Sequence, residues 1–261
     1  MKVISLCFLC SLSPVVFGQT NDIKETPENW YQSGQDELQK AIAASQALNT
    51  STAKNVILFI GDGMGVSTVT ASRIFDGQSR GETGEENLLS FEQFPHIGLS
   101  KTYNTNQQTP DSAGTMTAMM TGVKSKAGFI AVDQTAERGN CTSAQKAKLT
   151  TLLEQAEAAG FATGIVSTAR ITHATPAATY AHTPERNWES DANMPESAIK
   201  AGCKDIAQQL IQFSIPHNKN NGDSNNISNG IEVIMGGGRV NFLPRQQNSD
   251  ANQFPPGVRK D

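Results

Sequence analysis

The sequence predicts an α/β fold: a three-layer α/β/α sandwich with a mostly parallel central sheet. Three short apolar runs, at residues 55–60, 163–167 and 231–235, alternate with longer segments of helical periodicity. Strands that alternate with helices build βαβ units, and such units form parallel sheets covered on both faces. Ligands of these sheets bind beyond the C-terminal ends of the strands, so the residues after each run are candidate site residues.

The composition is that of a globular protein. The 261 residues are 37% hydrophobic and include 22 glycines, which excludes a disordered or collagen-like chain. There are 21 Lys and Arg against 25 Asp and Glu, a net charge of -4. This mild acidity argues against a nucleic-acid partner.

Residues 1–18 are expected to be a secretory signal peptide. Lys2 precedes an apolar stretch that ends at the small residue Gly18. The stretch is too short to span a membrane and no later one approaches 18 apolar residues, so no transmembrane segment is expected. Cleavage leaves Cys141 and Cys203 in an oxidising compartment, secreted or periplasmic. One disulfide between them is predicted, with two buried free thiols as the alternative.

The helices follow from apolar residues at a period near 3.6. The Met-rich segment after Pro110 begins with small residues that suit a helix start, and Gly160 is a typical helix terminator. The predicted helices are 28–47, 65–75, 112–120, 146–159 and 195–213.

The strands follow from short apolar or alternating runs that end in glycine or polar residues. Residues 55–60, NVILFI, read as a strand buried on both faces. The remaining predicted strands are 97–103, 163–167 and 231–235, and the Asn-rich stretch 218–230 is expected to be a connection.

The first chemical candidate is Asp62, between glycines directly after the strand at 55–60. A dinucleotide-binding loop needs G-x-G-x-x-G, but position 66 is Val. A carboxylate at a strand end suits a cation better. The alternative is that Asp62 merely caps the next helix.

Ser112 is the candidate nucleophile. It follows Pro110 and Asp111 at the start of a helix, where free backbone N–H groups favour an anion. An ordinary Ser or Asp cap is the alternative reading. No G-x-S-x-G elbow is present, which disfavours an α/β-hydrolase.

His173, Thr175 and Arg186 follow the strand at 163–167 and form a third candidate group. An Arg fork can hold two phosphate oxygens, and a Thr oxygen suits a hard metal. Each signal is weak by itself, and the four histidines have no close zinc-ligand spacing.

Together these segments resemble the secreted alkaline phosphatases, in particular the animal-type branch and its bacterial relatives. The resemblance covers nearly the whole chain after residue 18. The matching runs are AKNVILFIGDGMGVSTVTASRI (53–74), TPDSAGTMTAMMTGVKSKAG (109–128), GIVSTARITHATPAATYAHTPERNWESDA (164–192) and IEVIMGGGR (231–239).

The resemblance implies phosphate monoester hydrolysis through a phosphoserine, with two Zn²⁺ and one Mg²⁺ as cofactors. Ser112 would be the nucleophile, and Arg186 would bind the phosphate oxygens. Asp62 would bridge zinc and magnesium, Thr175 would be a magnesium ligand, and His173 would lie close to the magnesium. The resemblance also implies a homodimer and small phosphate monoesters as substrates.

One departure from the family pattern limits these expectations. The family's other metal ligands lie further along the chain, and no His follows Gly238. Residues 19–261 therefore resemble the N-terminal portion of a single alkaline phosphatase domain, with an incomplete sheet, expected to be unstable and nearly inactive alone. The alternatives are a truncated secreted protein without turnover and a related metallo-sulfatase or phosphodiesterase; Val66 disfavours a nicotinamide-binding module.

Overall fold

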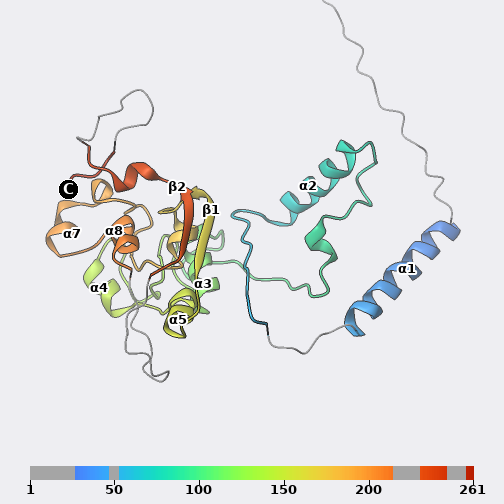
Figure 1. The fold of residues 1–261 in the computed structure, drawn as a ribbon, viewed down its shortest axis with the longest axis horizontal. Helices are drawn as coiled ribbons and strands as arrows, with labels where there is room; N and C mark the ends of the chain where they lie inside the picture. The colour runs from blue at the N-terminus through green and yellow to red at the C-terminus, as the bar shows by residue number, and fades with distance from the viewer. Residues whose placement is uncertain (1–26, 47–52, 214–229, 246–256) are drawn as a thin grey trace, which may run out of the picture. The chain divides into compact units, whose positions relative to one another are not determined.

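A computed structural model describes residues 27–46, 53–213, 230–245 and 257–261 (Figure 1). The expected signal peptide at 1–18 and nearly all of the connection at 218–230 lie outside these ranges. The chain divides into two compact units, the first ending at Leu99 and the second beginning at Ser100.

The described part of the first unit contains two helices and a short 3₁₀ turn. The helices α1 (Pro27–Gln46) and α2 (Val66–Ser79) confirm the predictions at 28–47 and 65–75, and η1 spans Ser90–Gln93. Asn87 anchors the loop after α2, because its amide donates to Arg73 O at 2.8 Å and to Asp76 Oδ2 at 2.9 Å. These polar contacts hold the loop to the helix.

The predicted strands at 55–60 and 97–103 are wrong for this structure. Both segments lack strand pairing. A strand buried on both faces needs neighbouring strands for its N–H and C=O groups, and the described part of the first unit contains no strand. The apolar side chains of the 55–60 run are therefore exposed; Phe59, for example, is 90% exposed.

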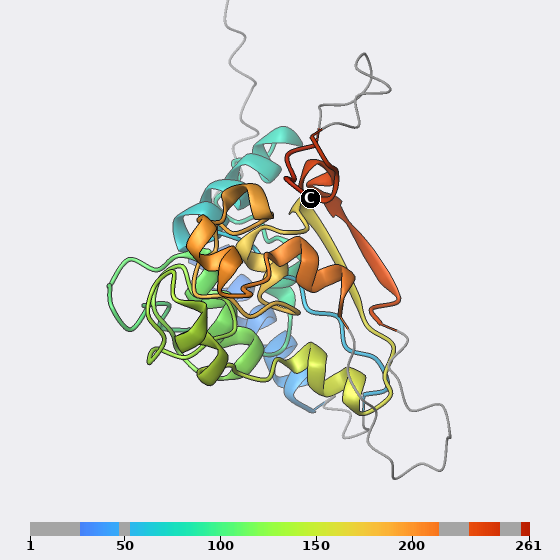
Figure 2. The ribbon, with the colours of Figure 1, turned by 90° about the vertical axis from the view of Figure 1, so that its left-hand side faces the viewer.

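The second unit holds a two-stranded parallel sheet, which is a part of the larger parallel sheet that the sequence predicts. Strands β1 (Gly164–Arg170) and β2 (Val233–Gly237) lie side by side in both ribbon views (Figures 1 and 2). Gly164 pairs with Val233 and Val166 with Met235, in parallel register. The strands confirm the predictions at 163–167 and 231–235, so the fold is mixed α/β with a small parallel sheet, the one sheet among the described residues.

The second unit also contains several short helices. α3 contacts α5 and α6, α6 contacts β1, and α8 contacts η4. The elements are α3 (Ser112–Thr121), α4 (Cys141–Lys146), α5 (Leu152–Ala158), α6 (Ala174–Ala177), η2 (Asp191–Asn193), α7 (Glu196–Lys200), α8 (Ile206–Ile211) and η4 (Arg239–Phe242).

Two predicted helices are shorter than expected. The prediction at 146–159 begins only at Leu152, because Thr151 and Glu154 form a capping box there. The prediction at 195–213 is broken into α7 and α8. Gly202 takes a φ of +77° between them, and Asp205 starts α8 by accepting from Gln208 N at 2.7 Å.

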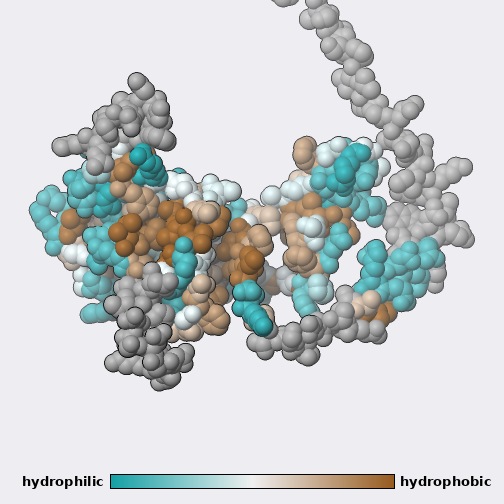
Figure 3. Space-filling model, viewed as in Figure 1, coloured by the Kyte–Doolittle hydropathy of each residue, from teal (hydrophilic) through white to brown (hydrophobic). Residues whose placement is uncertain are grey.

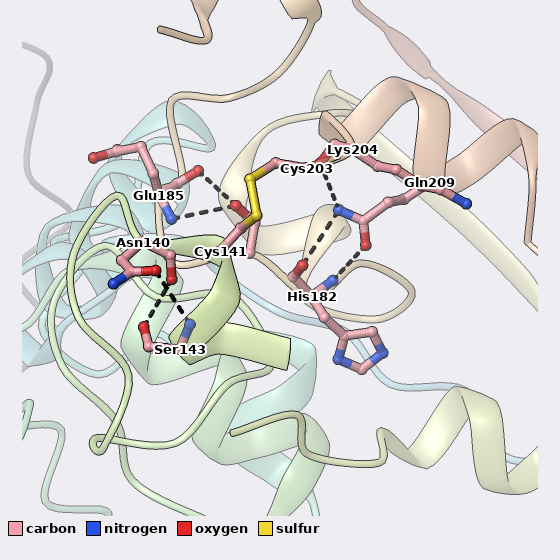
Figure 4. The surroundings of a disulfide bond; sticks show 9 residues. Asn140, Cys141, Ser143, His182, Glu185, Cys203, Lys204 and Gln209 are labelled. Carbon is pink, nitrogen blue, oxygen red and sulfur yellow. Dashed lines mark hydrogen bonds between the residues drawn. A yellow bond between two sulfur atoms is a disulfide. The ribbon is translucent and has the colours of Figure 1, made fainter. Parts of the chain in front are cut away.

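The predicted disulfide between Cys141 and Cys203 is present, with Cα atoms 5.8 Å apart. It joins α4 to the segment after α7 and packs against the buried side chains Trp188, Met194 and Ala198. The surroundings of the bond include Glu185, His182 and Gln209 (Figure 4). The disulfide therefore adds a covalent link next to this cluster of three buried side chains.

The outer surface of the sheet is apolar. A hydrophobic patch lies over the two strands in Figure 3. Val166 of β1 is 73% exposed and Met235 of β2 is 60% exposed. Among the described helices, none has the length and hydropathy needed to cross a membrane.

Candidate functional site

Ser112 is the first residue of α3, as the sequence predicts. Asp111 is the N-cap, and its carboxylate accepts from Gly114 N at 2.9 Å. Since Asp111 does the capping, Ser112 is not the capping residue and its half-buried hydroxyl lies in the first turn. Helix N-termini favour negatively charged groups, so Ser112 is in a position that suits an anionic substrate.

The fold brings Arg186 and His173 to this helix start. Arg186 Nη1 lies 3.1 Å from Asp111 Oδ2, although the residues are 75 positions apart. Arg186 Nη2 lies 3.1 Å from His173 Nε2. We call Asp111, Ser112, His173 and Arg186 the serine cluster. The structure thus brings three of the predicted site residues together: Asp111, the capping Asp that the alternative reading allowed, links the start of α3 to Arg186, and Arg186 contacts His173 directly.

The contact with Arg186 assigns a role to one ring nitrogen of His173. A guanidinium only donates hydrogen bonds, so His173 Nε2 is the acceptor in this contact. His173 is the N-cap residue of α6, directly after β1, and Thr175 is in the same short helix. Both residues therefore lie where the sheet topology predicts, beyond the C-terminal end of β1.

Asp111 stays ionised within the serine cluster. Burial raises the pKa of Asp111, but hydrogen bonds from Gly114 N, Asn104 and Gly128 N outweigh it and hold the pKa below its usual range. Asn104 Nδ2 donates at 2.9 Å and Gly128 N at 2.8 Å. The negative charge of Asp111 in turn stabilises the guanidinium of Arg186 beside Ser112.

A second polar network supports the loop that carries His173. Glu189 accepts from Arg170 Nε at 2.8 Å and from Thr172 Oγ1 at 2.7 Å, and Asn241 donates to Thr172 Oγ1 at 2.7 Å. Burial raises the pKa of Glu189, but the hydrogen bonds from Arg170 and Thr172 lower it below the usual value. The network links the end of β1 to η4 and fixes the backbone just before His173.

Asp62 belongs to the first unit, and the other predicted site residues belong to the second. Gly65, not Asp62, is the N-cap of α2, so the simple capping reading of Asp62 is wrong. A contact between Asp62 and the site around Ser112 stays a prediction.

The described residues do not make up a complete metal centre. No group of three or more His, Cys, Asp or Glu side chains gathers in the part of the chain that the structure describes. Asp62 and Thr175 offer only two of the oxygen ligands that the resemblance implies, and a zinc or magnesium site needs four to six ligands.

Sequence reasoning missed several residues that build the site. Asn104 and Gly128 bind Asp111, Glu185 precedes Arg186 in the chain, and Arg138 pairs with Glu185. Gly128 and Glu185 lie in the runs at 109–128 and 164–192, but no chain-local spacing indicates which residues they contact. Only the fold brings them together.

Fold and site together define an α/β protein with a serine at a helix start and an arginine beside it, an arrangement suited to phosphate-like anions. The sequence profile of alkaline phosphatases matches residues 53–261. The chain belongs to the alkaline phosphatase family and is homologous to phosphoric monoester hydrolases.

Individual relatives agree with this assignment. The chain is 46% identical over 254 residues to the tissue-nonspecific alkaline phosphatase of Gallus gallus, covering 97% of this chain and 45% of that protein. It is 44% identical over 261 residues to the Homo sapiens tissue-nonspecific isozyme, covering 99% and 46%. The chain thus spans about half the length of these relatives. A solved cold-active alkaline phosphatase from a Shewanella species is 31% identical, covering 54% of this chain and 37% of that chain, with a TM-score of 0.42.

Proposed function

We propose that the complete protein hydrolyses phosphate monoesters through a phosphoserine formed on Ser112. The observation that carries the proposal is the serine cluster: the hydroxyl in the first turn of α3 lies next to Asp111, which is ion-paired with Arg186. Residues 19–261 are proposed to be the N-terminal portion of one alkaline phosphatase domain with a three-layer α/β/α architecture. A secreted or periplasmic location is proposed because the chain carries a disulfide.

Each residue of the serine cluster has a proposed role. Ser112 Oγ attacks phosphorus, the ester oxygen leaves as the alcohol, and water then displaces the serine and releases inorganic phosphate. Arg186 binds two non-bridging oxygens of the phosphoryl group, since its contacts with Asp111 and His173 engage two of five N–H groups. Positioning and charge stabilisation of this kind carry most of phosphoryl-transfer catalysis.

Two zinc ions and one magnesium ion are proposed as cofactors, by family membership. Such ions lower the pKa of a bound hydroxyl and stabilise charge on phosphate oxygens. Asp62 and Thr175 are the proposed ligands from this chain. Homodimerisation is likewise a proposal.

The test uses the complete protein with zinc and magnesium and compares p-nitrophenyl phosphate, bis(p-nitrophenyl) phosphate and p-nitrophenyl sulfate. The expected result is fastest turnover of the monoester. Faster turnover of the diester or the sulfate would instead favour a related phosphodiesterase or sulfatase.

Ser112→Ala tests the covalent step, with Ser197→Ala as the matched control. Both serines lie in the first turn of a helix, and Ser197 is exposed in α7 away from the serine cluster. Ser112→Ala should abolish labelling by radioactive phosphate and turnover, whereas Ser197→Ala should keep both. A wild-type protein that binds phosphate, takes up no label and shows no turnover is a binder and contradicts the proposal.

A further inference from the structure

Arg138 and Glu185 form a two-pronged ion pair next to the serine cluster. Arg138 Nε lies 2.6 Å from Glu185 Oε2, and Arg138 Nη2 lies 2.8 Å from Glu185 Oε1, across 47 positions of sequence. A planar guanidinium that binds a carboxylate through two parallel hydrogen bonds fixes both distance and orientation. The pair therefore locks the segment at Arg138 onto the segment that carries Arg186.

The guanidinium of Arg138 also lies against the backbone at Gly128. Arg138 Nη1 donates to Ala127 O at 2.9 Å. A Cβ added to Gly128 would lie 2.1 Å from Arg138 Nη1, and Gly128 has a φ of +78°. The absence of a side chain at Gly128 thus allows Arg138 to reach both Ala127 and Glu185.

Gly128 and Glu185 connect this pair to Arg186 itself. Gly128 N donates to Asp111 Oδ2 at 2.8 Å, and Arg186 N donates to Gly128 O at 2.9 Å. Glu185 Oε1 also accepts from Asn187 N at 3.0 Å, so this carboxylate holds the backbone on the far side of Arg186. The side chain of Arg186 is held by Asp111 and His173, and its backbone is held by these contacts.

We infer that Arg138 and Glu185 are positioning residues that set the place of Arg186, and through it the binding of a phosphoryl group at Ser112. We call Arg138, Glu185 and Gly128 the arginine clamp. This inference deepens the proposed function and rests on it. Neither Arg138 nor Glu185 belongs to the serine cluster, and they act through the Arg186 backbone.

A purely stabilising role is the alternative, and the geometry disfavours it. Arg138 is 47% and Glu185 17% exposed, so solvent screens part of the attraction between the two charges and reduces what the pair contributes to folding. The clamp, however, has contacts on both sides of the Arg186 peptide. Small errors in the position of a substrate-binding group are costly in rate.

The first test compares Glu185→Gln with Glu196→Gln in the complete protein. Both changes remove one carboxylate charge from an ion pair, but Glu196 pairs with Lys200 on the exposed surface of α7. Glu185→Gln places an amide group against a guanidinium and breaks the two-pronged bond. We expect it to weaken inhibition by inorganic phosphate about tenfold, while Glu196→Gln leaves the inhibition constant unchanged.

A second readout does not depend on activity. The Arg186 amide donates to Gly128 O, so its hydrogen exchange reports the clamp directly. Glu185→Gln should accelerate this exchange roughly tenfold, and Glu196→Gln should not. Arg138→Lys keeps the charge without the fork, so it should recover part of the phosphate affinity that Arg138→Ala loses.

Gly128→Ala and Gly160→Ala form a second matched pair. Both glycines have positive φ values, +78° and +80°, but no atom lies within 4 Å of a Cβ at Gly160. Both variants therefore carry backbone strain, and only Gly128→Ala displaces Arg138. We expect both variants to fold, and only Gly128→Ala to lose phosphate affinity.

The outcomes separate this inference from the proposed function. If the wild-type protein does not hydrolyse monoesters, the proposed function fails, and Arg186 amide exchange then decides whether the clamp holds the backbone. If Glu185→Gln matches Glu196→Gln in phosphate inhibition and in amide exchange, the inference is overturned. If Glu185→Gln lowers the melting temperature but leaves phosphate affinity unchanged, the clamp contributes to stability alone, and the inference is also overturned.

Discussion

At the scale of single residues, Asp111 has two functions in one carboxylate. Its Oδ1 caps α3 and accepts from Asn104, and its Oδ2 binds Gly128 N and Arg186. The same group thus starts the helix that carries Ser112 and orients the guanidinium beside it. Removal of this carboxylate leaves several donors without their acceptor.

Asp111→Ala is expected to destabilise the protein more than an ordinary cap deletion does. We expect a loss of about 2–4 kcal/mol in the free energy of unfolding, because a cap and three further hydrogen bonds disappear together. Asn140→Ala is the control, since Asn140 caps α4 through Ser143 N; it should cost about 1 kcal/mol. Urea titration measures both, and equal losses would contradict the cooperative role of Asp111.

Glu154 provides a pH-dependent contribution to stability. Its Oε1 lies 2.8 Å from His182 Nε2, and His182 Nδ1 lies 2.9 Å from Ala131 O. Burial raises the pKa of Glu154, but the hydrogen bond and attraction from His182 outweigh it and hold the pKa below 4.5, its ordinary value. A depressed carboxyl pKa stabilises the folded state above the unfolded pKa, and this contribution is lost as the pH falls through the folded value.

Glu154→Gln is therefore expected to destabilise the protein near pH 7 and to matter less in acid. The difference in unfolding free energy from wild type should be about 1–3 kcal/mol near neutral pH and shrink as the pH falls below 4.5. Urea titrations at several pH values measure this difference. Glu137→Gln, at an exposed position, is the control. A difference that stays constant through the acid range would contradict a lowered pKa of Glu154 in the folded protein.

The residue scale also shows what the sequence can and cannot predict about the site. Ser112, His173 and Arg186 stand in long motifs and are placed together by the structure. Glu185 stands in the same run as Arg186, but its pairing with Arg138 could not be found from the sequence, because the contact spans 47 positions and depends on the backbone at Gly128. The roles of the site residues stay predictions until they are measured.

At the scale of elements, the start of α3 depends on a glycine inside the helix. A Cβ at Gly114 would lie 2.8 Å from Asn104 Oδ1 and 2.9 Å from Lys126 O. Gly114 is thus needed for close packing of α3 against two neighbouring segments. The intrinsic preference of a helix for Ala over Gly is outweighed at this position.

Gly114→Ala and Gly34→Ala are expected to change stability in opposite directions. Gly114→Ala should lower the free energy of unfolding by about 1–3 kcal/mol through overpacking. Gly34 lies in α1 with no atom within 4 Å of an added Cβ, so Gly34→Ala should stabilise α1 by about 0.5–1 kcal/mol. Urea titration measures the first effect and amide exchange in α1 the second. Two effects of the same sign would contradict the packing argument.

The elements themselves were predictable where local signals decide them. β1, β2 and α3 lie where the apolar runs and the helix-start residues indicate. The run at 55–60 has the same composition as a buried strand, but strand formation requires partners that no local pattern supplies. The break between α7 and α8 has a local signal, Gly202, that the 3.6-residue periodicity of 195–213 obscured.

At the scale of the whole molecule, two clusters of buried hydrophobic side chains stand out among the described residues of the second unit. One consists of Phe129, Val132, Ala136, Ala144 and Ala147, and another of Trp188, Met194 and Ala198. Alanine predominates in the first, and the second has only three members. The disulfide between Cys141 and Cys203 packs against the second cluster, so a covalent link supplements limited apolar burial there.

Loss of this disulfide is expected to destabilise the second unit strongly. The bond closes a loop across 62 positions, and the chain-entropy model assigns about 4 kcal/mol to a loop of this size. The paired replacement Cys141→Ser with Cys203→Ser should lower the midpoint of urea unfolding by the corresponding amount. Trp188 reports the transition by fluorescence, because it is 4% exposed in the cluster that the bond contacts.

Treatment of wild-type protein with reductant should reproduce the effect, whereas the paired serine variant should not respond to it. The disulfide stabilises the protein by restricting the unfolded chain. Its loss should therefore lower the free energy of unfolding but leave the native contacts around Arg186 nearly unchanged. Amide exchange at Arg186 under native conditions is therefore expected to stay close to that of wild type. Rapid exchange there in the serine variant would show that the bond also holds the arginine clamp in place, and that the entropic account is incomplete.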